Sequence, residues 1–427
     1  NMQKVALTAL AGTSIEWYDF FLYGAAAALI FPTAFFGEMP PTTALLLSLL
    51  TFAAGFIARP IGGIVFGHFG DKVGRKKTLI SALMLMGVSS TLIGLLPTYA
   101  MIGVAAPILL TSLRFAQGLA IGGQWGGAML LVTESAPSNQ RGYYGAFAQA
   151  GAPIGVILAN LALIITSALV SEEFFNTWGW RIPFLASAVL ILISMYIQLN
   201  LEDTEAFKAL ANNKDTQSNN NIQKSPVIEA IRKYPKRIFL AAGAFLSVQV
   251  TFYILIAFML AYGVTSANMA RDDMLAAVLI ASAIMVPIQF VFSSYSDRHG
   301  RKGIFMLGAI LTAIWAFVIF PLVDTGNFYL IVLAISGGLI FLAMMYGPQA
   351  AFFTELFSTE VRYSGATLGY QFGAIVGGAF APTIAVKLWT EFDIIWVSAY
   401  IALASLLTLI SVMALTETYQ SDLNNTD

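Results

Sequence analysis

The sequence contains no cysteine, only two histidines and few charged residues. Charged residues make up 11% of the 427 positions, whereas soluble domains carry about 25%. The absence of cysteine excludes disulfides and thiolate metal sites. His68 and His299 both lie outside the apolar runs, so a histidine proton shuttle within a membrane is excluded. Hydrophobic residues make up 58% of the chain and the mean hydropathy is +0.77, which indicates an integral membrane protein.

Several functional classes lack their signatures. The net charge of −1 gives no reason to expect a nucleic-acid partner. No Gly-rich loop ends in Gly-Lys-Ser or Gly-Lys-Thr, so ATP is not expected to drive the protein. The sequence shows no metal-ligand cluster and no filter loop, which makes a channel the least favoured membrane class. We expect no catalytic residues, no metal, no cofactor and no enzymatic activity.

Twelve apolar segments are long enough to cross a bilayer as helices, which takes about 20 residues each. Together they predict an all-α membrane protein with twelve transmembrane helices in two pseudo-symmetric six-helix bundles. The predicted domains are 1–200, a cytoplasmic linker at 201–237, and 238–427. The predicted spans are 5–36, 42–66, 78–97, 104–133, 143–169, 180–200, 238–263, 272–294, 303–323, 328–356, 364–389 and 394–415.

The distribution of Lys and Arg predicts the orientation. With both termini in the cytoplasm, 17 of the 22 basic residues fall in inner segments, as the positive-inside rule requires. Seven of them lie in the polar stretch that separates the two sets of six spans. Its Asn-rich middle is typical of a flexible linker, and Ser225-Pro226 predicts the start of a short amphipathic helix.

The two halves repeat each other at matched positions. Asp-x-x-Gly-Arg-Lys occurs at 71–76 and again at 297–302, after spans 2 and 8. A Glu followed seven residues later by an Arg ends span 4 and span 10, as Glu134 with Arg141 and Glu355 with Arg362. These repeats indicate a duplicated six-helix unit, which predicts a substrate site between the halves near mid-membrane.

The repeated motifs resemble those of the major facilitator superfamily. "GHFGDKVGRKK" is similar to that family's signature loop. More narrowly, "IEWYDFFLYG", "ARPIGG", "RFAQGLAIGGQWGGA", "WGWRIPF" and "VRYSGATLGYQ" resemble the metabolite:proton symporter branch. The resemblance covers nearly the whole chain. It implies uptake of small organic acids or compatible solutes such as shikimate, 2-oxoglutarate, citrate, proline or betaine, with the shikimate type most similar. One position departs from the branch, which reads Gly-Gly-Glu-Trp where this chain has Gln124.

Four charged residues fall well inside the predicted spans, away from their ends: Glu16, Asp19, Arg59 and Arg114. A charge at the bilayer centre costs about 2.5–3.5 kcal/mol, so each must face a wet cavity or a partner. Glu16 and Asp19 share one helix face and are candidates for proton coupling, with Gln124 as a third position. Arg114 is the candidate for a substrate carboxylate, because a guanidinium binds one bidentately. The alternative is structural: Glu16–Arg59 or Asp19–Arg114 as fixed ion pairs.

Polar and aromatic residues of the spans are further candidates for the cavity wall, although each is also suited to holding helices together. The candidates of the first half are Tyr18, Tyr23, Gln117, Trp125 and Gln149. Those of the second half are Gln249, Tyr253, Gln289, Tyr346, Gln349, Tyr370 and Gln371.

The inner loops are predicted to form a gate. In the resembled family, the Asp and Arg of the signature loop bind neighbouring helix ends when the protein faces outward. We therefore expect Asp71 near Arg362, Arg75 with Glu134, and Arg301 with Glu355. Gly74 provides the tight turn. The gating set is completed by Arg59, Arg141 and Asp297. The alternative is that these charges only keep the loops in the cytoplasm.

The leading hypothesis is a proton-coupled carrier that takes up a small organic anion by alternating access. Its expected partners are that anion, protons and the lipid bilayer. We expect a monomer in the bacterial inner membrane. The rival hypotheses are a proton-coupled efflux antiporter, a compatible-solute symporter and a receptor that binds substrate without moving it.

Overall fold

The structure is a computed structural model that describes residues 2–73, 75–202, 226–357 and 362–421. All of its regular elements in those ranges are helical, which confirms the predicted fold class. The segment 203–225, most of the predicted linker, lies outside the described residues. The short helix predicted after Ser225 is present as α12 (Pro226–Lys233).

The first half of the chain forms six long helical segments. One of them is divided at Ala150 into α7 and α8. Another begins with the 3-10 turn η1, which leads directly into α10. Three short helices, α2, α5 and α9, lie between the long ones. The bounds are α1 (Met2–Leu29), α2 (Phe31–Phe36), α3 (Pro41–Val73), α4 (Arg75–Leu95), α5 (Tyr99–Ile102), α6 (Ala105–Ser135), α7 (Arg141–Gln149), α8 (Gly151–Leu169), α9 (Glu172–Thr177), η1 (Gly179–Arg181) and α10 (Ile182–Glu202).

The second half forms six further long segments, two of which contain a π-helical turn. Such turns widen a helix locally and are frequent at functional sites. The bounds are α13 (Pro235–Tyr253), the π turn η2 (Ile254–Phe258), α14 (Met259–Thr265), α15 (Arg271–His299), α16 (Arg301–Asp324), α17 (Phe328–Glu355), α18 (Arg362–Gly373), the π turn η3 (Ala374–Ala379), α19 (Ala381–Glu391) and α20 (Ile394–Ala414).

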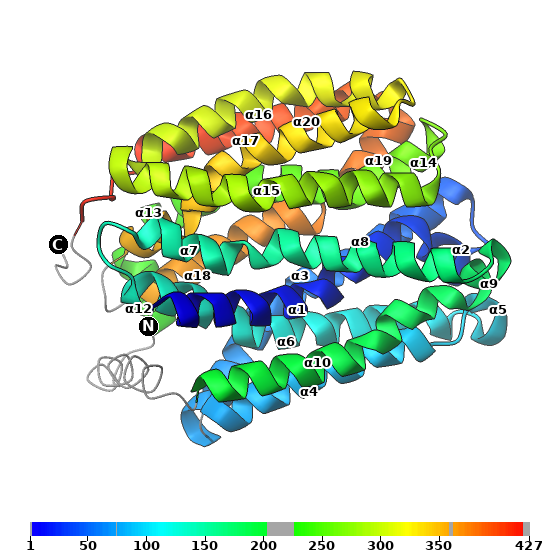
Figure 1. Cartoon of the computed structure of the whole chain (residues 1–427), viewed down its shortest axis with the longest axis horizontal. Helices are drawn as coiled ribbons and strands as arrows, with labels where there is room; N and C mark the ends of the chain where they lie inside the picture. The colour runs from blue at the N-terminus through cyan, green and yellow to red at the C-terminus, as the bar shows by residue number, and fades with distance from the viewer. Residues whose placement is uncertain (1, 74, 203–225, 358–361, 422–427) are drawn as a thin grey trace.

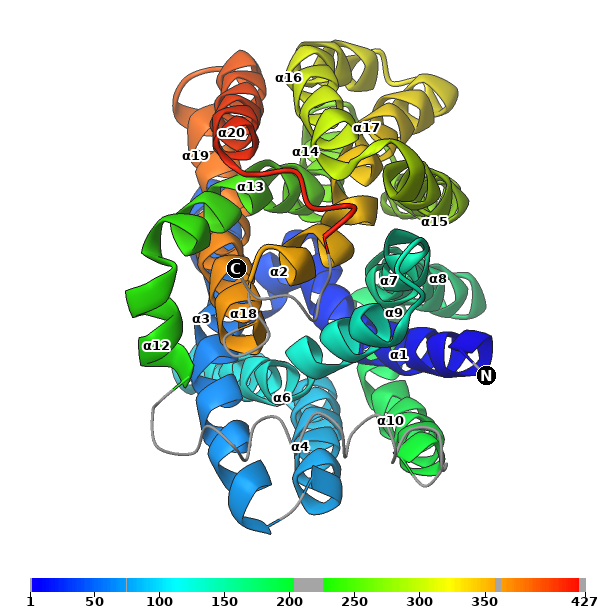
Figure 2. The same ribbon diagram turned by 90° about the vertical axis from the view of Figure 1, so that its left-hand side faces the viewer.

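The twelve segments run roughly side by side along the long axis (Figure 1). Viewed from the end, α15, α16, α17 and α20 lie above, and α4, α6 and α10 lie below (Figure 2). Two contacts join the halves symmetrically: α8 packs on α15, and α3 packs on α19 and η3. Both termini of the described chain lie at one end, which we call the inner end because the sequence predicts it to be cytoplasmic.

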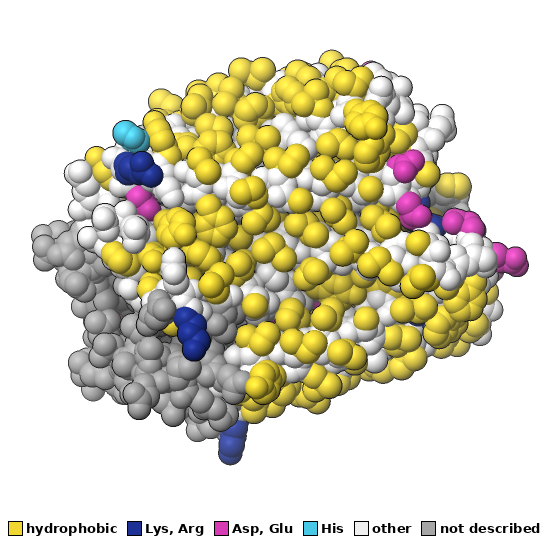
Figure 3. Space-filling view, in the orientation of Figure 1, with side chains coloured by type: hydrophobic (Ala, Val, Ile, Leu, Met, Phe, Trp, Pro, Cys, Tyr) yellow, Lys and Arg dark blue, Asp and Glu magenta, His cyan; other side chains and the backbone are white. Residues whose placement is uncertain are grey.

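Ten of the long segments are long and apolar enough to cross a membrane within the described residues. The other two are α1, which carries the buried acids, and α4, whose apolar part is limited to Ile80–Leu95. Hydrophobic side chains cover the flank of the molecule, and the charged side chains visible on that face lie toward its two ends (Figure 3). This distribution is what a bilayer requires of the surface that it surrounds.

Backbone-to-backbone contact joins α3 to α6. A methyl group placed on Gly118 would lie 2.8 Å from the carbonyl carbon of Gly55, and one on Gly122 would lie 2.7 Å from that of Arg59. Small residues permit this approach in membrane helices. The contact fixes the height of Arg59 relative to α6.

The glycine of the repeated inner motif is visible in its second copy. Gly300 ends α15 with a φ of 102°, a conformation that glycine adopts at little cost. The first copy, Gly74, lies outside the described residues.

Candidate functional site: the cavity between the halves and the inner gate

A small cavity lies between the two halves. Its volume is ≈20 Å³, little more than one water molecule needs. Both halves contribute to its wall, and no acidic residue lines it. The lining residues are Trp17, Phe21, Ala152, Val248, Gln249, Phe252, Tyr253, Leu342, Tyr346 and Tyr370. Four of the predicted binding residues therefore meet here: Gln249, Tyr253, Tyr346 and Tyr370. The sequence-based selection missed the lining aromatics Trp17, Phe21 and Phe252.

Arg59 is buried beside this cavity. Its side chain is 1% exposed, and its guanidinium carbon lies 4.9 Å from the ring centre of Trp17 and 4.2 Å from that of Phe20. Its charge acts on Tyr253 and Tyr370 across the boundary between the halves. None of its three nitrogens has a hydrogen-bond partner of good geometry. Arg59 is not itself among the lining residues, and its assignment to the gate stays a prediction.

Arg114 lies inside the first bundle. Its guanidinium donates to the carbonyls of Phe20 and Phe52, each at 3.3 Å, and to Gln117 at 3.1 Å. It lies 3.7 Å from the ring centre of Phe20 and 4.6 Å from that of Tyr23. One nitrogen, Nη2, has no partner among the described residues. The residue does not line the cavity, and its contacts favour the structural alternative; its substrate role stays a prediction.

Asp19 faces the interior of the same bundle. Its carboxylate accepts a hydrogen bond from Ser187 of α10, and Ser90 of α4 is a second hydroxyl neighbour. Gln117 donates to Ser90 at 2.8 Å, so hydrogen-bonding groups extend from Arg114 through Gln117 and Ser90 to Asp19. Among the described residues no ion pair joins Asp19 to Arg114. The fixed pair that the sequence left open is not formed.

The other first-half candidates hold helices together. Tyr18 donates to the carbonyl of Pro183 at 2.8 Å, and the hydroxyl of Tyr23 lies 2.6 Å from that of Thr51. Glu16 is buried and has an interaction partner; the alternative pair with Arg59 is not found among the described residues. The side chains of Gln124 and Trp125 lie outside the described residues, so their roles stay predictions.

A pair of glutamines, Gln149 and Gln349, joins the two halves. Gln149 of α7 donates to Gln349 of α17 at 3.3 Å and to the carbonyl of Tyr346 at 3.4 Å. Gln289 is buried without a side-chain partner, and Gln371 has a buried oxygen without one. None of these four glutamines lines the cavity.

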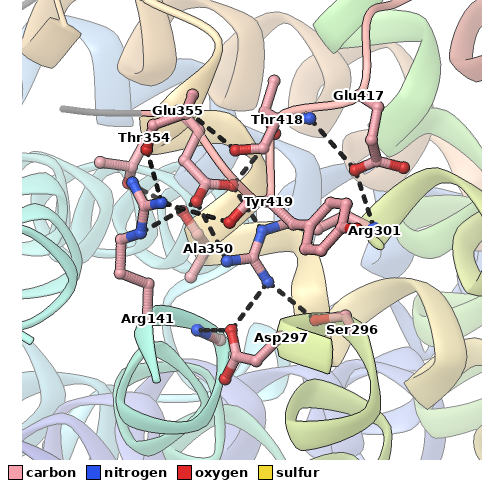
Figure 4. A network of polar contacts seen from close by, with 12 residues as sticks. Arg141, Ser296, Asp297, Arg301, Ala350, Thr354, Glu355, Glu417, Thr418 and Tyr419 are labelled. Carbon is pink, nitrogen blue, oxygen red and sulfur yellow. Dashed lines mark hydrogen bonds and ion pairs between the residues drawn. The ribbon is translucent and has the colours of Figure 1, made fainter. Parts of the chain in front are cut away.

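Glu355 is the centre of a polar cluster at the inner end, where the sequence predicts the gate. Figure 4 shows Arg141 and Arg301 on either side of it. Arg301 donates to it through Nε and, at 3.0 Å, through Nη2, and Arg141 pairs with it at 3.1 Å. The predicted Arg301–Glu355 pair is therefore confirmed. Arg141 belongs to the first half, so this acid also joins the two halves.

Asp297 makes a second link between the halves. Its carboxylate accepts from the backbone amides of Gly142 at 2.7 Å and Tyr143 at 3.0 Å, at the amino end of α7. The positive end of a helix favours such a contact. Asp297 also pairs with Arg301 at 3.1 Å. The sequence predicted Asp297 as a gate residue but not this partner.

The segment that follows α20 adds contacts to the same polar cluster. Glu417 accepts from the amides of Arg301 at 2.9 Å and Lys302 at 3.0 Å, and Thr418 donates to Glu355 at 3.0 Å. Arg141 donates to the carbonyl of Ser421 at 2.7 Å. The sequence analysis missed these contacts. No motif marks them, because they join residues more than 60 positions apart.

The equivalent contacts of the first repeat cannot be compared. Gly74 lies outside the described residues, as do the side chains of Asp71, Arg75, Glu134 and Arg362. The pairs Asp71–Arg362 and Arg75–Glu134 stay predictions.

The halves also touch at the opposite, outer end. Arg271 of α15 pairs with Glu172 of α9 at 3.1 Å, and Ser167 of α8 donates to Asp272 at 2.9 Å. Deeper, Asn160 donates to the carbonyl of Leu275 at 3.1 Å. Contacts at both ends therefore enclose the small cavity.

The fold consists of two six-helix bundles, with a cavity at their boundary and a charged cluster at one end. This arrangement is that of secondary membrane transporters. The chain matches the family described as Major Facilitator Superfamily over residues 9–368, and it belongs to that family. Solved structures agree on the fold. A D-xylose–proton symporter superposes with a TM-score of 0.75 at 16% identity, over 98% of each chain.

Curated relatives extend over nearly the whole chain. The inner membrane metabolite transport protein YhjE of Escherichia coli K12 is 40% identical over 99% of this chain and 96% of its own. The shikimate transporter of the same strain is 37% identical over 94% and 91%. A proline/betaine transporter of Salmonella typhimurium is 31% identical over 98% and 84%. The chain is thus a metabolite transporter of this family and not an enzyme.

Proposed function

We propose that the protein is a proton-coupled carrier that takes up a small organic acid across the bacterial inner membrane, as a monomer with both termini in the cytoplasm. The names of the relatives support this substrate class. The observation that carries proton coupling is Asp19. This carboxyl is 1% exposed and is bonded by a hydroxyl, without an ionic partner among the described residues.

A carboxylate without a counter-charge is costly inside a membrane. A bound proton removes that charge, and the hydroxyl of Ser187 suits either form because it both donates and accepts. Asp19 is therefore the position at which a proton is taken up and released during the cycle. The neighbouring polar groups of Asp19, Ser90, Gln117 and Arg114 couple the charge of Asp19 to the interior of the bundle.

Alternating access follows from the two sets of end contacts. The inner gate and the outer contacts are separate groups of polar side chains, so each can break while the other holds. The closed cavity is the state between the two openings.

A second candidate is the uptake of a betaine-type solute. Six of the ten residues lining the cavity are aromatic, and aromatic faces attract quaternary ammonium groups. A betaine also carries a carboxylate, so the same wall suits both substrate classes.

Transport in proteoliposomes tests the proposal. Labelled shikimate, other organic acids and glycine betaine are each offered with an inward proton gradient and without one. We expect accumulation of an organic acid that needs the gradient, and Asp19→Asn should abolish accumulation while leaving exchange of internal for external substrate intact. Accumulation that is independent of the gradient, or unchanged in Asp19→Asn, would contradict proton coupling through this residue.

A further inference from the structure

Arg59 is a buried cation whose hydrogen-bonding capacity is largely unused. Its three nitrogens are buried and make no hydrogen bond of good geometry, although the hydroxyls of Tyr253 and Tyr370 interact with it. A guanidinium has five N–H donors in its plane. Leaving buried charged donors unpaired carries a substantial free-energy cost. Attraction to the rings of Trp17, Phe20 and Phe56, at 4.9, 4.2 and 4.5 Å, offsets part of that cost. These rings interact with the guanidinium as π systems and accept no conventional hydrogen bond.

The guanidinium of Arg59 lies at the boundary between the halves. Trp17, which contacts Arg59, lines the cavity, and so do Tyr253, Tyr346 and Tyr370, on which the charge of Arg59 acts. No Asp or Glu lines that cavity. The site therefore carries one positive charge that the described residues lining it do not balance.

We propose that Arg59 is the residue that binds the carboxylate of the transported substrate; this assignment rests on the proposed uptake of an organic acid. A carboxylate matches the planar fork of a guanidinium with two parallel hydrogen bonds. One negative charge balances the site, which favours monocarboxylates over dicarboxylates.

The opposite half supplies a second anchor. Gln249 lines the cavity, and its side-chain oxygen is buried without a partner. An unpaired acceptor requires a donor, such as a substrate hydroxyl. With Arg59 in the first half and Gln249 in the second, a small hydroxylated monocarboxylate would bridge the bundles. The cavity of ≈20 Å³ is too small for such a molecule, so binding must draw the two walls apart.

Arg59 is favoured over Arg114 because of what each already contacts. Arg114 donates to two backbone carbonyls and an amide oxygen, and these bonds tie α1 and α3 to α6. Arg59 makes no hydrogen bond of good geometry, so it has less than Arg114 to lose when it binds a ligand. A substrate therefore gains more from Arg59, and the fold loses less.

Binding to the purified full chain in detergent tests the assignment without any gradient. Thermal stability is measured with a panel of small hydroxylated and plain monocarboxylates, each paired with its neutral primary amide, and with sodium nitrate at equal ionic strength. Binding raises the melting temperature by mass action. We expect at least one acid to stabilise the wild type while its amide and nitrate do not.

Two substitutions sharpen the result. Arg59→Lys keeps the charge but loses the fork, so the affinity for the acid should fall at least tenfold, about 1.4 kcal/mol. Arg59→Gln should remove the preference for the acid over its amide. Arg181→Lys is the matched control: Arg181 is also buried and donates to the carbonyls of Gly94 and Leu96, outside the cavity. It should bind the acid as the wild type does.

The assignment is overturned if no acid stabilises the wild type, if amides or nitrate do so equally, or if Arg59→Lys retains full affinity. The comparison of acid with amide in the wild type does not depend on any variant folding. Asp19→Asn should keep the preference for the acid, so a failure of proton coupling and a failure of the Arg59 site give different results.

Discussion

The carboxylate of Glu355, in the second half of the chain, lies 3.1 Å from the guanidinium of Arg141 in the first half. Both side chains are buried, and Glu355 is fully so. The same carboxylate binds Arg301 of its own half. One acid thus holds two arginines, and the loss of its charge would leave both without a counter-charge.

Glu355→Gln should therefore open the inner end. Removing one partner of a buried ion pair costs about 3–5 kcal/mol, and this cost falls on the closed state in which the pair exists. Because the chain has no cysteine, a single Ala152→Cys in the cavity wall can be labelled without background. We expect the labelling rate by an impermeant maleimide, applied from the inner side, to rise at least tenfold.

The control for that experiment is Glu391→Gln. Glu391 also forms an ion pair, with Lys387 at 2.6 Å, but about half of each side chain is exposed. Exposed pairs contribute little to stability, so labelling should not change. A Glu355→Gln protein that labels at the wild-type rate would show that the pair does not close the gate.

The tail after α20 should support the same closure more weakly. Glu417 binds the first amides of α16, and the loss of a helix-capping side chain typically costs about 1 kcal/mol. Glu417→Ala should raise inner-side labelling of Ala152→Cys by roughly fivefold, the factor that such an energy represents. Asp393→Ala removes the cap of α20 without touching the gate and should leave labelling unchanged; equal effects of the two would mean that the tail acts only through general stability.

The sequence predicted the features whose signals are local or repeated. Long apolar runs located the twelve spans, and the repeated Asp-x-x-Gly-Arg-Lys motif pointed to the Arg301–Glu355 pair. The sequence favoured Arg114 for the substrate and Arg59 for the gate, although both are single arginines in apolar helices. Which of them lies beside the residues that line the cavity depends on helix rotation, and the glycine contact between α3 and α6 restricts that rotation. The contacts of the segment after α20 could not be predicted from the sequence either. They depend on the path by which this segment folds back to Arg141.

Arg114→Lys separates the two interpretations of that residue. Lysine retains the charge but cannot reach the carbonyls of Phe20 and Phe52 together. On the structural interpretation we expect a lower melting temperature, corresponding to about 1–3 kcal/mol for unsatisfied buried groups, with substrate affinity within a few-fold of the wild type. A tenfold loss of affinity at an unchanged melting temperature would restore the substrate role.

The close approach of α3 and α6 should be sensitive to a single methyl group. In Gly122→Ala the new carbon would overlap the carbonyl oxygen of Arg59 and lie 2.7 Å from its carbonyl carbon, so the helices must separate and Arg59 must move. We expect both a lower melting temperature and weaker acid binding. Gly303→Ala is the matched control, because nothing lies within 4 Å of its added carbon. Alanine is also more favourable than glycine within a helix, by about 1 kcal/mol. If both variants bind alike, the contact does not position Arg59.

Gln124→Glu restores the acid found at this position in the resembled branch and tests whether it belongs to the proton path. Ten residues of α6 separate it from Arg114, about 15 Å along the axis at 1.5 Å per residue. A glutamine keeps the shape of a protonated glutamate but never releases a proton. The wild-type chain should therefore accumulate substrate through the remaining acids alone, with a shallower dependence on pH than a chain that has an acid at position 124. The glutamate variant should show a steeper dependence of uptake on the inward proton gradient, measured in proteoliposomes at several internal pH values. Identical pH profiles for the two side chains would exclude position 124 and leave Asp19 and Glu16 as the acids that carry the proton.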